Sequence, residues 1–182
     1  MTFTSAASAE RFLHHGMVSP MSPLADTCGM MQGWSGGAPA ATAWPSANLA
    51  IGYPFQINEI ATVYGAWYAA GGTAGGNLDI GIYDLAGNRV VSTGTTARTI
   101  SAHTEITALT DTVLTPNHYY ATMSADTTNL YTGWTTGVVG TQEAQGWVES
   151  ASSFVLPSTI TFSRTGQAFM PYFGFNFYSV AS

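Results

Sequence analysis

Short runs of β-branched and aromatic residues, separated by clusters of turn-forming residues, follow one another from residue 49 to the end of the chain. The clearest run, residues 77–84, alternates Leu78, Ile80 and Ile82 with polar or small residues. This two-residue period predicts a β-strand with one face in the core. No segment between these runs shows the period of an amphipathic helix, so the pattern limits the chain to an all-β fold.

The expected strands are numerous and closely spaced. Asp84 to Asn88 supplies the residues of a tight turn after the first run, which predicts a hairpin with 89–92. The C-terminal run, 169–180, predicts a long central strand with a buried row of phenylalanines. The other expected strands are 57–68, 105–109, 118–124, 130–134, 146–148 and 159–162. Together they predict an antiparallel jelly roll or β-sandwich of about eight strands.

The excess of acidic over basic residues limits the classes of partner that the chain can bind. Ten acidic residues and four arginines are the only charged residues among 182, and the formal net charge is -6. Nucleic-acid binding requires clustered basic side chains, so that class of function is excluded. The apolar content of 46% is enough for a globular core.

Neither export nor membrane insertion is expected. Residues 1–25 lack the apolar run of a signal peptide, and no apolar stretch approaches the roughly 18 residues that cross a bilayer. Cys28 is the only cysteine, which rules out an intramolecular disulfide. We therefore expect a protein that is not exported and has no membrane partner.

Composition changes near residue 49. Residues 1–48 are rich in Ala, Ser, Gly, Met and Pro and lack apolar periodicity, which predicts an extended arm in front of a β-domain at 49–182. Such an arm has no core of its own, so we expect it to lie on a neighbouring subunit or partner. Its large apolar residues are the candidate contacts: Phe3, Phe12, Leu13, Met17, Met30, Met31, Trp34 and Trp44.

No catalytic site is expected. Ser35 lies in a Gly-x-Ser-x-Gly pattern, but neither a clear strand before it nor a helix after it supports a nucleophile elbow. Adjacent His14 and His15 lack the spacing of metal ligands, and nothing in the sequence pairs any two of Glu59, Glu105, Glu143 and Glu149 as catalytic carboxylates. The turn residues Asp79, Asp84, Asn88 and Asp126 fit no calcium-loop signature. We expect an enzymatically inactive protein without metal or cofactor.

Aromatic residues make up 13% of the chain. Large rings serve as core residues, as anchors of subunit interfaces and as platforms for sugars, and these interpretations remain open together. In the sugar-binding interpretation, the candidates are Trp67, Trp134 and Trp147, exposed on the β-domain.

Three segments resemble the jelly-roll domains of tailed-bacteriophage virion proteins. Residues 79–94 (DIGIYDLAGNRVVSTG) match the hairpin of those domains, and 114–126 (LTPNHYYATMSAD) match the strand that follows. Residues 171–174 (PYFG) match the late strand that closes the sheet. Asn117 stands where that pattern has glycine, and asparagine tolerates the same left-handed backbone.

The resemblance implies a capsid decoration, or cement, protein. Such a protein would be made in the host cytoplasm and form a homotrimer on the outside of the virion. It would bind the major capsid protein and stabilise the assembled shell by mass action. The alternative is a tail-fibre or spike domain that binds host-surface glycans. Deleting residues 1–48 is expected to leave a folded domain that no longer binds the shell.

Overall fold

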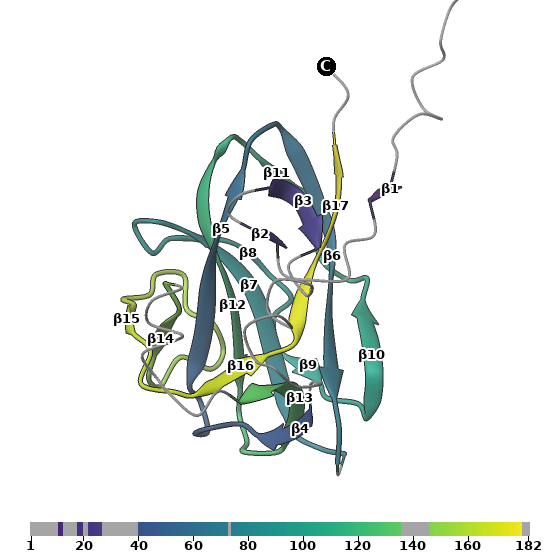
Figure 1. The fold of residues 1–182 in the computed structure, drawn as a ribbon, viewed down its shortest axis with the longest axis vertical. Coiled ribbons are helices and arrows are strands. Elements are labelled where there is room, and N and C mark those ends of the chain that lie inside the picture. The colour runs from purple at the N-terminus through teal and green to yellow at the C-terminus, as the bar shows by residue number, and fades with distance from the viewer. Residues whose placement is uncertain are drawn as a thin grey trace, which may run out of the picture.

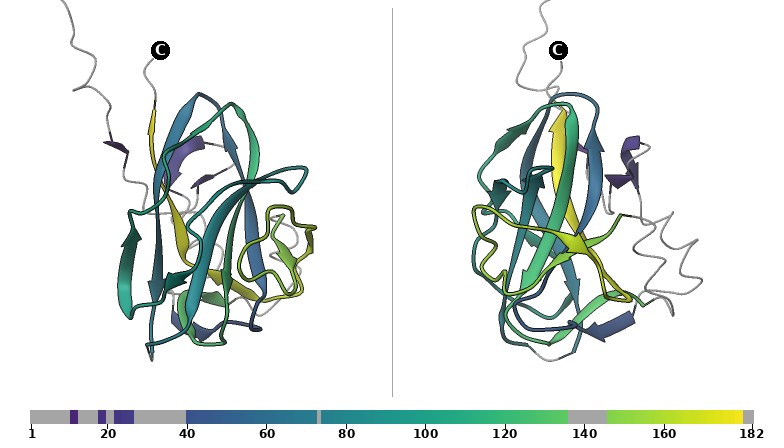
Figure 2. Two further views of the ribbon diagram at one scale, coloured as in Figure 1. Left: turned by 180° about the vertical axis from the view of Figure 1, so that it is seen from behind. Right: turned by 90° about the vertical axis from the view of Figure 1, so that its left-hand side faces the viewer.

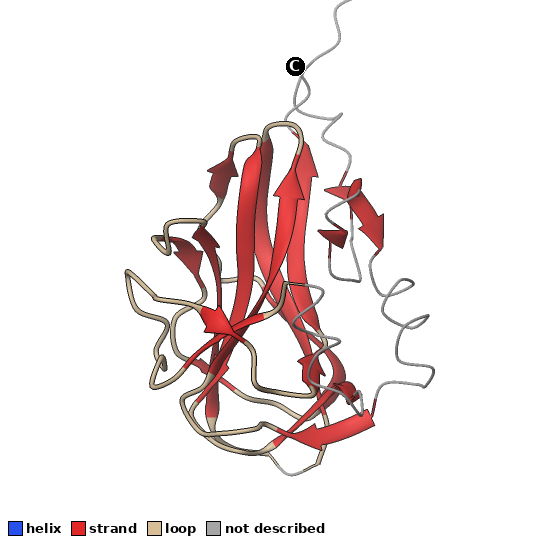
Figure 3. Cartoon of the chain, turned by 60° about the vertical axis from the view of Figure 1, so that its left-hand side comes forward, coloured by secondary structure: helices blue, strands red, loops and turns tan. Residues whose placement is uncertain are grey.

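The computed structural model describes residues 11–12, 18–19, 22–26, 40–72, 74–135 and 146–179. Every regular element in these residues is a β-strand, and every strand pair is antiparallel (Figure 1). Two sheets pack face to face, as Figure 3 shows in red. The predicted all-β sandwich is confirmed, and none of the described residues forms a helix that could cross a membrane.

The eight-stranded sheet is organised around β6. Its strands are β1 (Arg11–Phe12), β4 (Ala40–Ala43), β6 (Ala61–Ala70), β10 (Ser101–Ile106), β11 (Thr112–Leu114), β13 (Leu130–Thr135), β16 (Phe169–Pro171) and β17 (Phe173–Ser179). β17 pairs with β6 along its whole length. On the opposite side of β17 from β6, β1 pairs with Phe177 and Tyr178 near the C-terminal end of β17 (Figure 2). The predicted C-terminal strand is thus interrupted at Tyr172, and β17 lies near the border of its sheet.

The seven-stranded sheet is organised around β12. Its strands are β5 (Ala50–Ile57), β7 (Asn77–Asp84), β8 (Arg89–Ser92), β9 (Thr96–Ala97), β12 (Asn117–Ala125), β14 (Val148–Ser150) and β15 (Ser163–Arg164). β12 pairs with β5 on one side and with β7 on the other. The predicted hairpin of β7 and β8 is confirmed.

The core lies between the two sheets. Phe173, Phe175 and Phe177 of β17 are at most 3% exposed, and their row faces β5. The ring centroids of Tyr53 and Phe173 are 5.3 Å apart. Leu78, Ile80 and Ile82 of β7 are fully buried in the same core. The predicted inward faces of both strands are confirmed.

Strand β5 was not expected, because Pro54 interrupts its sequence. Proline lacks the N–H that a central strand must donate. β14 pairs with β5 only as far as Gly52, so Pro54 lies where one side of β5 is without a partner strand among the described residues. The edge position explains how a proline is accommodated.

The outer face of the seven-stranded sheet is also covered. The predicted strand at 159–162 does not form, and the segment 151–162 instead lies over β7 and packs Leu156 and Ile160 against it. The Ile160 N–H donates to the Gly87 carbonyl over 2.8 Å. Gly87 has a φ of 83°, and a Cβ there would lie 2.1 Å from the Ile160 oxygen. β7 is therefore buried on both faces.

The predicted boundary between arm and domain, after residue 48, is wrong. Inside the predicted arm, β4 pairs with β13 from Ala40↔Gly133 to Ala43↔Leu130, and Trp44 belongs to the core. The sandwich therefore begins near residue 40. Before it, β2 (Val18–Ser19) pairs with β3 (Ser22–Asp26), and both contact β5.

Candidate interaction surfaces

Most of the predicted arm contacts cannot be placed. Phe3, Leu13, Met17, Met30, Met31 and Trp34 lie outside the described residues, as do Ser35, His14, His15 and Cys28. The backbone of Phe12 pairs with that of Phe177 in β17. The arm thus meets the sandwich through strand pairing at the border of the eight-stranded sheet.

Trp44, the last predicted arm contact, is a core residue. Its side chain is 1% exposed, and its Nε1–H donates to the Leu49 carbonyl over 3.1 Å. Its ring meets those of Tyr131 and Phe169 edge to face, with centroids 5.2 and 5.9 Å away. The prediction that Trp44 contacts the shell is wrong, because the ring is enclosed by its own subunit.

The three predicted sugar platforms are not exposed. Trp67 is 0% exposed, and Trp134 and Trp147 are each 2% exposed. Trp147 packs on Tyr53 in the core, with ring centroids 5.3 Å apart. A ring enclosed on both faces cannot stack on a saccharide, so the prediction fails for all three tryptophans.

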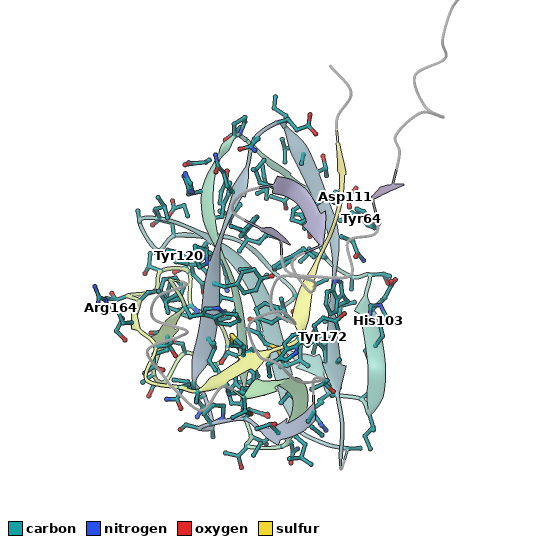
Figure 4. All side chains as sticks on the ribbon, viewed as in Figure 1. Tyr64, His103, Asp111, Tyr120, Arg164 and Tyr172 are labelled. Carbon is teal, nitrogen blue, oxygen red and sulfur yellow. The ribbon has the colours of Figure 1, made fainter. Side chains whose placement is uncertain are left out.

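Trp67 nevertheless faces away from the core. Its neighbours Ala66 and Tyr68 belong to the core, so the alternation of β6 directs Trp67 outward. Its ring centroid is 5.4 Å from that of His103 on β10 and 4.7 Å from that of Tyr172, which in turn lies 5.3 Å from Trp134 on β13. These four rings form an outer aromatic row; Figure 4 labels His103 and Tyr172.

Two of the carboxylates that were considered as calcium ligands instead accept hydrogen bonds from asparagines. Asp126 accepts hydrogen bonds from the backbone N–H and the side-chain amide of Asn77, both at 2.7 Å. Asp84 accepts the corresponding pair from Asn88 at 2.8 and 2.9 Å, which lowers the pKa of Asp84. Among the described residues, no three acidic, histidine or cysteine side chains gather into a metal site.

The glutamates occupy separate elements. Glu59 lies between β5 and β6, Glu105 on β10 and Glu149 on β14, while Glu143 is outside the described residues. Glu149 accepts hydrogen bonds from the Thr165 hydroxyl at 3.2 Å and the Gly166 N–H at 2.9 Å. This carboxylate holds the turn after β15.

Asp79 is a fully buried carboxylate beneath the segment 151–162. It accepts hydrogen bonds from the Leu156 N–H at 3.1 Å and from the Thr93 hydroxyl at 3.2 Å. Burial raises the pKa of Asp79, and these two bonds together with the charge of Arg89 offset only part of that effect. Asp79 therefore holds the covering segment through its bond to Leu156, but burial of its charged form is unfavourable.

Replacing Asp79 by asparagine is expected to stabilise the protein at pH 7. The raised pKa means that the folded state binds the proton more tightly than the unfolded state, so this group's contribution to stability falls as pH rises from the unfolded pKa through the folded one. Asparagine keeps an acceptor for Leu156 and removes the charge. Urea unfolding of both proteins at pH 4 and pH 7 should show an advantage for Asp79→Asn that grows with pH. An advantage that shrinks with pH contradicts the assignment.

No family model matches the sequence, and no curated protein or solved structure matches it significantly.

Proposed function

We propose that this protein is a structural virion protein that binds and stabilises a bacteriophage capsid shell from outside, as a homotrimeric decoration protein. The observation that carries the proposal is the division of the chain at residue 40. From β4 onward the chain builds the core of the sandwich. The residues before β4 carry few charges, and they contact the sandwich through pairing of β1 with β17 and through contacts of β2 and β3 with β5. Such a segment can bind a neighbouring subunit without disturbing the core.

The border of the eight-stranded sheet offers a suitable contact. β1 pairs with β17 only at Phe177 and Tyr178, and no described strand occupies that side of β17 from Phe173 to Asn176. Unpaired backbone groups on such a border accept further strands. Strand addition needs no charged partner, which suits a chain with so few charges.

Exposed apolar side chains lie at the same end of this sheet. Val113 is 59% exposed and pairs with Thr62, which pairs in turn with Tyr178 beside β1. Ile60, 48% exposed, immediately precedes β6. Exposed apolar side chains on the sheet that also carries the available strand border are typical of a subunit interface.

Two truncations test this function. Because the sandwich begins near residue 40, deleting residues 1–39 is expected to leave a folded protein that no longer cosediments with shells lacking the native protein. Deleting 1–48 also removes β4 and Trp44 and should destabilise the fold. A folded 1–39 deletion that still saturates shells overturns the role of the arm.

The copy number in purified particles tests the decoration role itself. Quantitative mass spectrometry is expected to give a ratio near one against the major capsid protein. A ratio of about a few per cent or less instead places the chain in a tail or vertex structure.

A further inference from the structure

A partly exposed aromatic patch lies on the outer face of the seven-stranded sheet. Tyr120 of β12 is opposite Pro54 of β5, and the ring of Phe162 lies over Tyr120 with its centroid 4.9 Å away. All three side chains are partly exposed, unlike the tryptophans. With Arg164 they form what we call the Tyr120 patch; Figure 4 labels Tyr120 and Arg164 on the same side of the molecule.

Buried side chains lie beneath the Tyr120 patch and hold its rings in place. Tyr83, fully buried, is opposite Tyr120 on β7 and meets the Phe162 ring edge to face at 5.6 Å. The Tyr83 hydroxyl donates to the Pro157 carbonyl over 2.7 Å, which ties Tyr83 to the covering segment. Leu156 and Ile160 complete the small apolar cluster against which Tyr120 and Phe162 pack. The two rings are therefore held in place before any ligand arrives.

Arg164, two residues after Phe162, places a positive charge on the same outer face of the sheet as these rings. It is opposite Val148, which is opposite Gly52 on the outer face of β5, so the pairing places its side chain on the face that carries Pro54 and Tyr120. Arg164 is exposed and forms no ion pair with any described residue. The adjacent carboxylate, Glu149, is already bound by Thr165 and Gly166.

Two other guanidiniums are used within the fold. Arg89 donates to the Leu156 carbonyl, and buried Arg98 donates to the carbonyls of Gly71 and Leu130. In a chain with a net charge of -6, Arg164 by contrast is exposed and able to meet an anion. An exposed charge on the same face as two fixed rings indicates a ligand with an apolar face and an anionic group.

We propose that the Tyr120 patch binds an acidic saccharide, a sugar bearing a carboxylate. The C–H face of a pyranose ring stacks on Tyr120 and Phe162, and its carboxylate accepts two parallel hydrogen bonds from Arg164. The Tyr120 hydroxyl and the exposed side chain of His118, on the same face of β12, are available for sugar hydroxyls. This site lies on the seven-stranded sheet, whereas the border of β17 proposed as a shell contact belongs to the eight-stranded sheet.

The test compares an oligomer of a hexuronic acid with the same oligomer after its carboxyl groups are reduced to alcohols. Calorimetric titration of the full chain is expected to show binding of the acidic oligomer and at least about tenfold weaker binding of the reduced one. Arg164→Gln should weaken binding of the acidic oligomer by a similar factor and leave binding of the reduced oligomer unchanged. Tyr120→Leu should weaken binding of both.

Tyr172→Leu, an aromatic substitution on the opposite sheet, is the matched control and should bind like the unchanged protein. Circular dichroism of each variant establishes that it is folded. Equal affinity for the two oligomers, unchanged binding by Arg164→Gln, or no binding of either oligomer at millimolar concentration each overturns the proposal. These titrations use the full chain and saccharides without shells, so their failure is distinguishable from failure of the shell-binding experiment.

Discussion

Replacing Trp44 by alanine is expected to lower the free energy of unfolding by about 4 kcal/mol, the usual cost of removing a buried tryptophan. The substitution empties a site lined by Tyr131 and Phe169 and leaves the Leu49 carbonyl without its Nε1–H donor. It also removes the core side chain that immediately follows β4. Urea unfolding followed by circular dichroism measures the loss.

Trp44→Phe is the matched control. It keeps a ring between Tyr131 and Phe169 but cannot donate to Leu49, so the expected loss is about 1–2 kcal/mol. The order Ala, Phe, Trp of increasing stability supports the placement of Trp44 in the core. If Trp44→Ala costs less than about 1 kcal/mol, the first 48 residues are an arm as the composition suggested, and the sandwich does not need β4.

The strands that could be predicted are those whose signals are local. Residues 77–84 and 89–92 are strands as expected, because alternation and turn chemistry lie within one short stretch. Burial of the phenylalanines of β17 follows from the same two-residue period. β4 could not be predicted, because Ala40–Ala43 has no distinctive side chains and pairs with a strand about ninety residues later in the chain.

Whether a side chain is exposed was harder to predict from the sequence than which local segments pair as strands. Asp79 and Tyr83 alternate with core residues, yet they are buried because a segment more than seventy residues away covers them. The sequence could have predicted that Tyr120 points away from the core. It lies two residues after His118 in an expected strand, so both side chains are on the same face. The proximity of Tyr120 to Phe162, and the position of Arg164 on the same outer face, depend on the path of the chain after β14, for which the sequence has no local signal.

Replacing Arg98 by methionine is expected to cost about 3 kcal/mol, because it removes the hydrogen bonds of a buried guanidinium to two carbonyls. The guanidinium is 4% exposed, and its Nη2 donates to the carbonyls of Gly71, after β6, and of Leu130, at the start of β13. It also lies 4.9 Å from the centroid of the Tyr131 ring. Methionine fills much of the volume but leaves both carbonyls with a lost donor.

Two further arginine substitutions separate charge from geometry. Arg98→Lys keeps the charge but lacks the planar fork, so we expect a loss of about 2 kcal/mol. Arg89→Met, at an exposed arginine that donates to a single carbonyl, should cost no more than about 1 kcal/mol. Unfolding free energies from urea titration distinguish the three variants. If Arg98→Met is no more destabilising than Arg89→Met, the cost of burying the charge cancels its bonds, and Arg98 does not join the ends of β6 and β13 in the way its contacts indicate.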